Sequence, residues 1–377
     1  MSTINQQTQL RISKTGLTAF DEEKACDGYI MFHPLCESEH TVNLINLKGE
    51  IVYQWNLPYA PHHSYLLPNG NLFYMGKVTN DDILKEDYIP NWINFKSGIL
   101  QEVDPKCKVV WEHRAKYQHH DAQRTDSGGA IYVSMELVPY DTARKIDKVL
   151  KGGVPGSGQH KMFADTIVEV DAFGKILWEW PSYKYLDFSL YTLSPPSPRN
   201  DLTHINSLWP IGDDKIMACL KHLSEIIIID KKTNQVIWRF GHDQFGHVHD
   251  ANILPNGNIL AFDNGVSRKT TIYPFSRVVE INPETFDFVW IYEDSPVHNF
   301  FSLYGSSARR LPNGNTFITE ANKGRMFQVT SEQEVVWEYI NPYFVHDLQG
   351  KFSNKLSRAM HYSKEDVERL LPLPLKK

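Results

Sequence analysis

The chain has 377 residues, of which 39 are Lys or Arg and 45 are Asp or Glu, so its formal net charge is −6. Because the chain is mildly acidic and its basic residues are scattered, we expect no nucleic-acid partner. The opening segment MSTINQQTQLRISKTGLTAF lacks the basic start and apolar core of a secretory signal, and no stretch reaches the ~20 apolar residues of a membrane span. We therefore expect a cytoplasmic protein with no membrane partner.

The four cysteines show no C-x-x-C spacing, which excludes a zinc knuckle and a thioredoxin-like motif. We expect four unpaired thiols, as in a reducing compartment, although Cys26 and Cys36 could pair in an oxidising one. The other two are Cys107 and Cys219.

Strands are expected first at 28–32 and 41–45, and the second of these leads into a repeated unit that ends in tryptophan. Each unit begins with a polar turn and continues as a β-branched run, which is typical of a hairpin turn that feeds a strand. The first example is Asn46-Leu-Lys-Gly-Glu-Ile-Val-Tyr-Gln-Trp55. The six units end at Trp55, Trp111, Trp178, Trp238, Trp290 and Trp337.

A second repeated segment, Leu-Pro-Asn-Gly-Asn, occurs at 67–71, 254–258 and 311–315. Asn-Gly favours a two-residue hairpin because both central residues of a type I′ turn need positive φ. The tryptophans are 47 to 67 residues apart, which fits one four-stranded blade of roughly 40–50 residues each, with insertions. The sequence therefore predicts an all-β fold, a six-bladed β-propeller that forms a single domain over residues 28–362.

The two ends of the chain flank this domain as an N-terminal extension, 1–27, and a C-terminal helical tail, 363–377. Ser363 is placed as the N-cap of the tail helix, with Asp366 three residues on. The sequence before Trp55 holds too few strands for a complete blade, so the first blade lacks its inner strand. Since the ring must close, either the segment after Trp337 supplies that strand or the blade stays three-stranded.

Three long insertions, at 77–96, 138–161 and 182–200, interrupt the repeats. We interpret them as loops over one face of the propeller, where loops often carry functional residues.

Histidines recur where the inner strand of each blade should begin, next to the central channel. If the repeats are equivalent, these side chains converge on one axial funnel. Several imidazoles at one funnel indicate an anionic ligand, a metal or proton transfer, because an imidazole is costly to bury without a partner. The histidines concerned are His62, His63, His119, His120, His204, His247, His249, His298 and His346.

Three local contexts sharpen this pattern. Asp201-Leu-Thr-His204-Ile-Asn206 surrounds a histidine with hydrogen-bonding neighbours, and Gly246-His247-Val-His249 puts two histidines on one strand face. Arg268 follows the strand after an Asn-Gly turn, which should return its guanidinium to the same rim, where it would suit a tetrahedral oxyanion.

A fourth context, Asp294-Ser-Pro-Val-His298, is followed by aromatic residues and Tyr304. This histidine could attack an acceptor while the rings stack on an aryl substrate, or it could simply cap the strand.

These segments resemble the PAPS-independent arylsulfotransferases (aryl-sulfate sulfotransferases), six-bladed propellers that move a sulfuryl group from one phenol to another through a sulfohistidine. The resemblance extends from about residue 43 to 362 and rests on the His and Arg positions, since Leu-Pro-Asn-Gly-Asn and the tryptophan units belong to the architecture. The chain departs from the family in three respects, namely the missing signal, the unpaired cysteines and the additional histidines His63, His120 and His346.

The resemblance implies four catalytic residues. His298, matched by its blade position, would carry the sulfuryl group, and Arg268 with His204 and His249 would neutralise the charge on its oxygens. Arg277 is the second choice for the arginine. We expect a small aryl or anionic substrate, no cofactor, and a substrate-binding set made of His63, His120, His247, Asn206, Tyr304 and His346.

Two other functions remain open from the residues alone. One is a lyase, hydratase or isomerase, in which a divalent metal on three imidazoles could assist proton transfer. The other is a non-catalytic propeller that binds a partner on its rim. The sequence does not indicate an oligomeric state.

Overall fold

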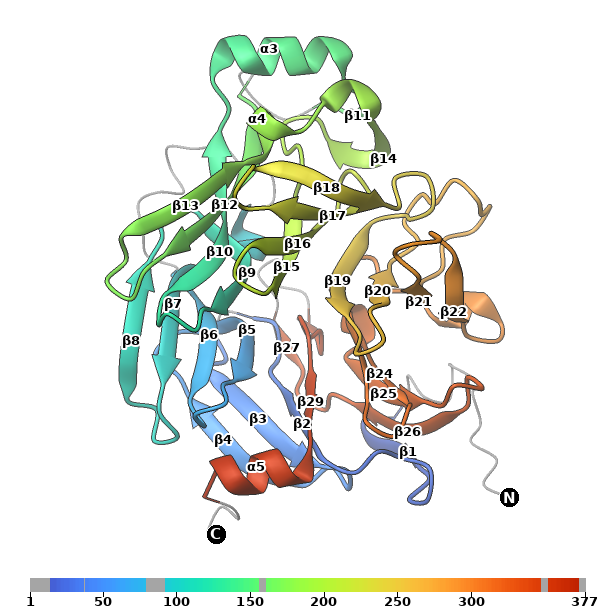
Figure 1. Cartoon of the computed structure of the whole chain (residues 1–377). Helices are drawn as coiled ribbons and strands as arrows, with labels where there is room; N and C mark the ends of the chain where they lie inside the picture. The colour runs from blue at the N-terminus through green and yellow to red at the C-terminus, as the bar shows by residue number, and fades with distance from the viewer. Residues whose placement is uncertain (1–13, 37, 79–91, 156–160, 347–351, 373–377) are drawn as a thin grey trace.

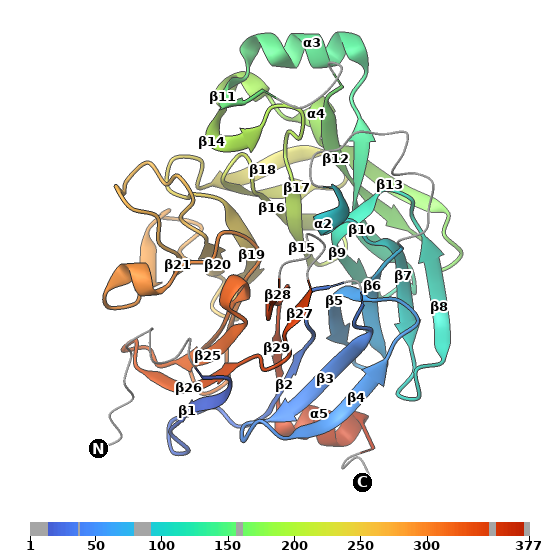
Figure 2. The ribbon, with the colours of Figure 1, turned by 180° about the vertical axis from the view of Figure 1, so that it is seen from behind.

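A computed structural model describes residues 14–36, 38–78, 92–155, 161–346 and 352–372. Six antiparallel sheets of four or more strands surround a common centre (Figures 1 and 2). The prediction of a six-bladed β-propeller is confirmed. In the described part of the chain, no helix has the length and apolar character needed to cross a membrane.

In blades two to six the strands follow one another in chain order from the centre outward, and blade three leaves out β11. Blade two consists of β5 (Pro61–Leu66), β6 (Leu72–Lys77), β7 (Gly98–Val103) and β8 (Val109–Arg114). Blade three consists of β9 (Gln118–Arg124), β10 (Ala130–Leu137), β12 (Phe163–Val170) and β13 (Ile176–Pro181). Blade four consists of β15 (Ile205–Ile211), β16 (Lys215–Leu220), β17 (Glu225–Asp230) and β18 (Gln235–Phe240). Blade five consists of β19 (Val248–Ile253), β20 (Ile259–Asp263), β21 (Arg277–Ile281) and β22 (Phe288–Tyr292). Blade six consists of β23 (Ser307–Arg310), β24 (Thr316–Glu320), β25 (Arg325–Val329) and β26 (Val335–Ile340).

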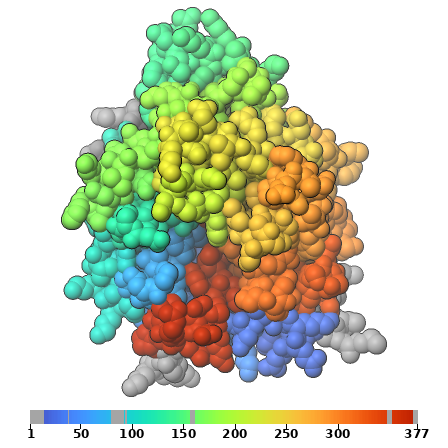
Figure 3. All heavy atoms as spheres, viewed as in Figure 1, coloured from blue at the N-terminus to red at the C-terminus, as the bar shows by residue number. Residues whose placement is uncertain are grey.

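Both ends of the chain close the ring. In blade one, β29 (Met360–Tyr362) pairs with β2 (Tyr29–Phe32), which is followed outward by β3 (Thr41–Asn46) and β4 (Ile51–Asn56). The segment after Trp337 therefore supplies the inner strand, and blade one is not three-stranded. From the expected N-terminal extension, β1 (Gly16–Phe20) pairs with β26 as a fifth strand of blade six. Figure 3 shows the blue N-terminal and red C-terminal segments of the described chain side by side.

The repeated tryptophans lie on the fourth strand of each blade and join neighbouring blades. Five of them donate the indole Nε1–H to the turn between the third and fourth strands of the next blade, over 2.8–2.9 Å. The pairs are Trp111 with Ala172 O, Trp178 with Asn234 Oδ1, Trp238 with Pro283 O, Trp290 with Ser331 O, and Trp337 with Leu47 O. At the remaining junction Tyr53 donates its hydroxyl to Pro105 O at 2.5 Å, and the buried Nε1 of Trp55 has no partner.

The Leu-Pro-Asn-Gly-Asn segments form the turns between the inner and second strands, but these turns are not type I′. Only the glycine has positive φ, as at Gly70 with 86°. The carbonyl of Leu67 accepts from Gly70 N, and Leu67 N donates to Asn71 O, as in a type I turn followed by a left-handed glycine. Asn69 instead uses its side chain, which accepts from Asn71 N at 3.0 Å.

The hydrophobic core lies between adjacent blades. Met217 and Ile226 of blade four, for example, pack against Val248 and Ile259 of blade five. Such clusters fix each blade against the next and hold the central strands in place. All four cysteines are free thiols, as expected.

All three insertions contain regular structure, which corrects the expectation of loops. Residues 138–161 include α3 (Tyr140–Val149) and β11 (Lys151–Val154), and β11 pairs in parallel with β14 (Thr192–Pro198) of the next insertion. With α4 (Ser182–Tyr185) and η2 (Phe188–Leu190) they stand together at the top of Figure 1. Of the expected loops, 79–91 and 156–160 lie outside the described residues.

The remaining short elements are α2 (Trp92–Phe95), η3 (Val297–Asn299), η4 (Ala321–Lys323), and the hairpin of β27 (Val345–His346) and β28 (Phe352–Ser353). The tail helix α5 (Lys364–Leu370) is present, and the Ser363 hydroxyl accepts from Asp366 N at 3.1 Å, as predicted. Val367 anchors α5 in the cluster of blades one and two.

Candidate functional site

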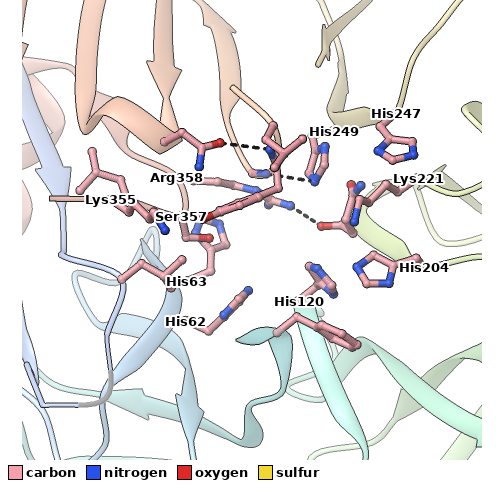
Figure 4. Close-up of a pocket in the computed structure, with 18 of the residues that line it drawn as sticks. His62, His63, His120, His204, Lys221, His247, His249, Lys355, Ser357 and Arg358 are labelled. Carbon is pink, nitrogen blue, oxygen red and sulfur yellow. Dashed lines mark hydrogen bonds between the residues drawn. The ribbon is translucent and has the colours of Figure 1, made fainter. Parts of the chain in front are cut away.

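A cavity of about 600 Å³ lies at the centre of the ring. Seven histidines from blades two to five line it, together with four basic side chains (Figure 4). The histidines are His62, His63, His120, His204, His222, His247 and His249. The basic side chains are Lys77, Lys221, Lys355 and Arg358.

Strand direction brings these side chains to one rim. Each inner strand begins at the cavity, and the second strand runs antiparallel to it and therefore ends there. His63, His120 and His249 belong to the inner strands. Lys77 is the last residue of β6, and Lys221 directly follows β16.

Three of the cavity histidines have a strained backbone. His120, His204 and His247 have φ of 51°, 50° and 63°. Positive φ is uncommon outside glycine, costs of order 1–3 kcal/mol, and persists where the surrounding structure holds it, often at functional sites. All three lie at the beginning of inner strands, so the strain occurs where the chain turns into the cavity.

Asp201 sets the tautomer of His204. Oδ2 of this buried carboxylate is 2.6 Å from Nδ1 of His204. A carboxylate only accepts, so the imidazole proton lies on Nδ1 and the lone pair lies on Nε2. Burial lowers the pKa of His204 well below 6.5, with nearby Lys221 adding to the effect. His204 is therefore a neutral imidazole with an unprotonated Nε2 in a ring that lines the cavity.

His249 is held differently. Asn264 donates from Nδ2 to Ser302 O at 2.8 Å, so its Oδ1 accepts the Nδ1–H of His249 at 2.6 Å. The Gly305 N–H then donates to Nε2 of His249 at 3.2 Å. Burial lowers the pKa of His249 to about 3. Its lone pair is already engaged, which makes it a poorer nucleophile than His204.

Two of the four basic side chains, Arg358 and Lys221, differ in how their charge is balanced. Arg358 lies 3.1 Å from Asp121 Oδ2 and 3.4 Å from Asp250 Oδ1, so its charge is balanced. Lys221 makes no side-chain hydrogen bond or ion pair with any described residue, and burial lowers its pKa to about 8. An anion entering the cavity would find its countercharge at Lys221.

The cavity brings together eight of the residues singled out from the sequence, namely His62, His63, His120, His204, Asn206, His247, His249 and Tyr304. Arg268, His298 and His346 are not in its wall. Arg268 is buried, with Nε 3.0 Å from Asp263 and Nη2 donating to Phe275 O at 2.7 Å. His346 is exposed on β27.

His298 does not begin the inner strand of blade six, which corrects the expectation from its blade position. It lies exposed in η3, and β23 begins at Ser307. The segment between Trp290 and the inner strand of blade six is longer than we expected from the corresponding segments of the other blades. The structure therefore separates His298 from the cavity histidines.

Sequence reasoning missed Lys77, Lys221 and His222, which come from the ends of second strands. The antiparallel return that pointed to Arg268 applies equally to these positions and could have found them. Sequence reasoning also missed Arg358, because the inner strand of blade one was left unassigned. Phe95 reaches the cavity on α2, beside β9 and β15 (Figure 2), and its insertion showed no signal for that placement.

Among the described residues, one set has the spacing of a metal site, namely Asp201, His204 and His222, with donor atoms within 4.8 Å of one another. Hydrogen bonds already account for this closeness. Nδ1 of His204 bonds to the Asp201 carboxylate, and Nδ1 of His222 bonds to the Asp201 carbonyl at 2.7 Å. Oδ1 of Asp201 is buried without a hydrogen-bond partner.

The fold and the cavity define a propeller with neutral imidazoles and a lysine at its centre, which suits a small anionic ligand. The family model described as arylsulfotransferase (ASST) matches residues 85–342. Because this match covers more than half of the chain, the chain belongs to that family.

One solved structure with a TM-score above 0.5 supports the fold. A protein of unknown function from Bacteroides caccae is 13% identical, with a TM-score of 0.52 and coverage of 89% of this chain and 98% of that chain. A streptogramin B lyase structure is 11% identical, with a TM-score of 0.47 and coverage of 92% and 93%. No curated protein matches the chain.

Proposed function

We propose that this chain transfers a sulfuryl group from an aryl sulfate to a phenol, and that Nε2 of His204 carries the group between two half-reactions. Membership of the arylsulfotransferase family supports the class of reaction. The observation that carries the assignment of His204 is its 2.6 Å hydrogen bond to Asp201, which leaves the lone pair on Nε2. A positioned, neutral imidazole is an activated nucleophile.

In the first half-reaction, Nε2 attacks sulfur, the N–S bond forms, and the S–O bond to the aryl group breaks. The electron pair of that bond leaves on the phenolate oxygen. In the second, the oxygen of the acceptor phenol attacks sulfur, the N–S bond breaks, and its electron pair returns to Nε2. No cofactor is needed for this exchange.

Two neighbours of His204 suit such a donor. Lys221 directly follows β16 and lies close enough to lower the pKa of His204, so it can offset negative charge on the sulfuryl oxygens. The ring of Phe95 lies 4.6 Å from that of His204, at an interplanar angle of 65°. An aryl group of the donor can pack against it.

The test is the intact mass of the protein after exposure to 4-nitrophenyl sulfate without an acceptor. We expect a mass increase of one sulfuryl group, which a phenol then removes. The increase should vanish in His204→Asn and persist in His298→Asn, a matched change at an exposed position. Loss of the adduct only in His298→Asn would refute the assignment.

The metal-assisted lyase, hydratase or isomerase has one observation in its favour, which is the spacing of Asp201, His204 and His222. A metal there would have to replace two hydrogen bonds. Elemental analysis of the purified protein distinguishes the two functions, because stoichiometric metal that is lost in His222→Asn would favour the alternative.

A further inference from the structure

A second hydrogen-bonded chain reaches the cavity from the interior. Nε2 of His119 is 3.0 Å from Oδ1 of Asp165, and Nδ1 of His119 is 2.8 Å from Nδ1 of His120. Asp165 and His119 are fully buried. Because the carboxylate accepts, His119 carries its proton on Nε2, and its Nδ1 must accept the Nδ1–H of His120. His120 therefore has its lone pair on Nε2.

The far end of this chain is also fixed. Oδ2 of Asp165 accepts from the Ile205 N–H at 2.5 Å and from the Thr203 hydroxyl at 2.7 Å. The Thr203 oxygen in turn accepts from Asp165 N at 3.2 Å, so its own proton points to the carboxylate. Only one oxygen of Asp165 is left for His119. The Asp165 carboxylate thus links the hydrogen-bonded series of His119 and His120 to β15, the strand that follows His204.

His120 is placed to act beside His204. The two rings have centroids 4.8 Å apart at 72°, and the ring of His120 stacks on Phe95 at 5.1 Å. Both histidines line the cavity, where Figure 4 shows them as neighbours. Two adjacent imidazoles, each with Nδ1–H engaged and Nε2 free of a hydrogen-bonded partner among the described residues, provide one nucleophile and one base.

We propose that His120 is the general base for the acceptor phenol, with His119 and Asp165 as positioning residues. The proposal rests on the sulfuryl transfer proposed above. As the acceptor oxygen attacks sulfur on His204, its proton moves to Nε2 of His120. The positive charge that results is stabilised through His119 by Asp165. The proton then passes to the phenolate that leaves the next donor, so one proton enters and one leaves in each cycle.

The first experiment separates the half-reactions in His120→Gln. Release of nitrophenolate from 4-nitrophenyl sulfate without acceptor needs no base, so we expect it to change less than about threefold. Transfer to phenols with pKa near 10 should fall about 100-fold, the scale of general base catalysis. The rate of transfer to acidic phenols, which are already ionised, should fall only slightly. Equal losses for all acceptors, or none, would overturn the proposal.

His62→Gln is the matched control, because the His62 ring lies 5.6 Å from that of His120 and its buried Nδ1 has no hydrogen-bond partner. We expect its effect to be the same for all acceptors. A dependence on acceptor pKa in this variant would show that the effect is not specific to the chain from Asp165.

The second experiment uses Asp165→Asn and needs no turnover. The Ile205 N–H and the Thr203 hydroxyl require an acceptor, so the amide oxygen should face them and the NH₂ should face His119. That arrangement reverses both tautomers and puts a proton on Nε2 of His120. Nitrogen-15 NMR of labelled imidazoles should show the lone pair on Nε2 of His120 in the wild type and on Nδ1 in the variant.

The two proposals fail in different ways. If the wild-type protein releases no nitrophenolate but His120 has the expected tautomer, sulfuryl transfer from aryl sulfates is wrong and the hydrogen-bonded chain stands. If nitrophenolate is released but His120 carries its proton on Nε2 in the wild type, His120 cannot be the base.

Discussion

His204 and Asp201 share a 2.6 Å hydrogen bond between Nδ1 and Oδ2, three residues apart at the entrance to the inner strand of blade four. Both side chains are buried, and the second oxygen of Asp201 has no hydrogen-bond partner. The only side-chain hydrogen bond of the carboxylate among the described residues is therefore the one to His204, while Nδ1 of His222 lies 3.8 Å from the same oxygen.

Asp201→Ala should lower kcat/KM with 4-nitrophenyl sulfate by about 100-fold or more, because it removes the group that orients His204 and fixes its tautomer. Asp201→Asn should cost less, since its amide oxygen can still accept the Nδ1–H. Steady-state kinetics with thermal unfolding as a check on folding would measure both. Equal activity of Asp201→Ala and the wild type would show that the bond is only structural.

Binding of an anionic donor analogue should weaken as the pH rises above 8. Lys221 has a pKa of about 8 because burial disfavours its charged form, so it loses its proton as the pH passes that value. At pH 9 we expect about tenfold weaker binding of an aryl sulfonate, measured by calorimetry. Lys221→Arg stays charged and should remove this decline. An unchanged decline in that variant would assign it to another group.

Stability should fall in acid through the buried neutral histidines. For His249 the folded pKa is about 3, below the usual histidine pKa of about 6.5, so the unfolded state binds one more proton between these pH values. The stabilisation is present above pH 6.5 and is lost as the pH falls towards 3, by about 1.4 kcal/mol per pH unit. Urea unfolding at pH 7 and pH 5 measures the slope, which should be smaller by that amount in His249→Gln.

Trp337→Phe should destabilise the protein more than Trp55→Phe. The first change removes the indole hydrogen bond to Leu47 O, which joins blade six to blade one, whereas the Nε1 of Trp55 has no partner. Both indoles are fully buried, so the packing losses are similar. Leaving Leu47 O unpaired should add about 1–2 kcal/mol to the cost, measured by urea unfolding. Equal costs would mean that the bond adds nothing to ring closure.

The residues that were predicted correctly share one property. Each was recognised from the sequence immediately around it. His63, His120, His204, Asn206, His247 and His249 were placed by repeating positions at inner strands, and the cavity contains them all. His298 was assigned by blade order and Arg268 by the expected return of its strand to the rim, and the structure places both elsewhere. Arg358 reaches Asp121 across 237 residues of sequence, a separation at which no local pattern gives a signal.

By itself the sequence determined the number of blades, the strand order of blades two to six and the convergence of histidines, because these follow from short periodic patterns of turns and apolar residues. Only the tertiary structure decided which nitrogen of each imidazole is available. Asp201 lies three residues from His204, but Asp165 lies 46 residues from His119. The position of a proton on an imidazole depends on the group that faces its other nitrogen, and folding selects that group.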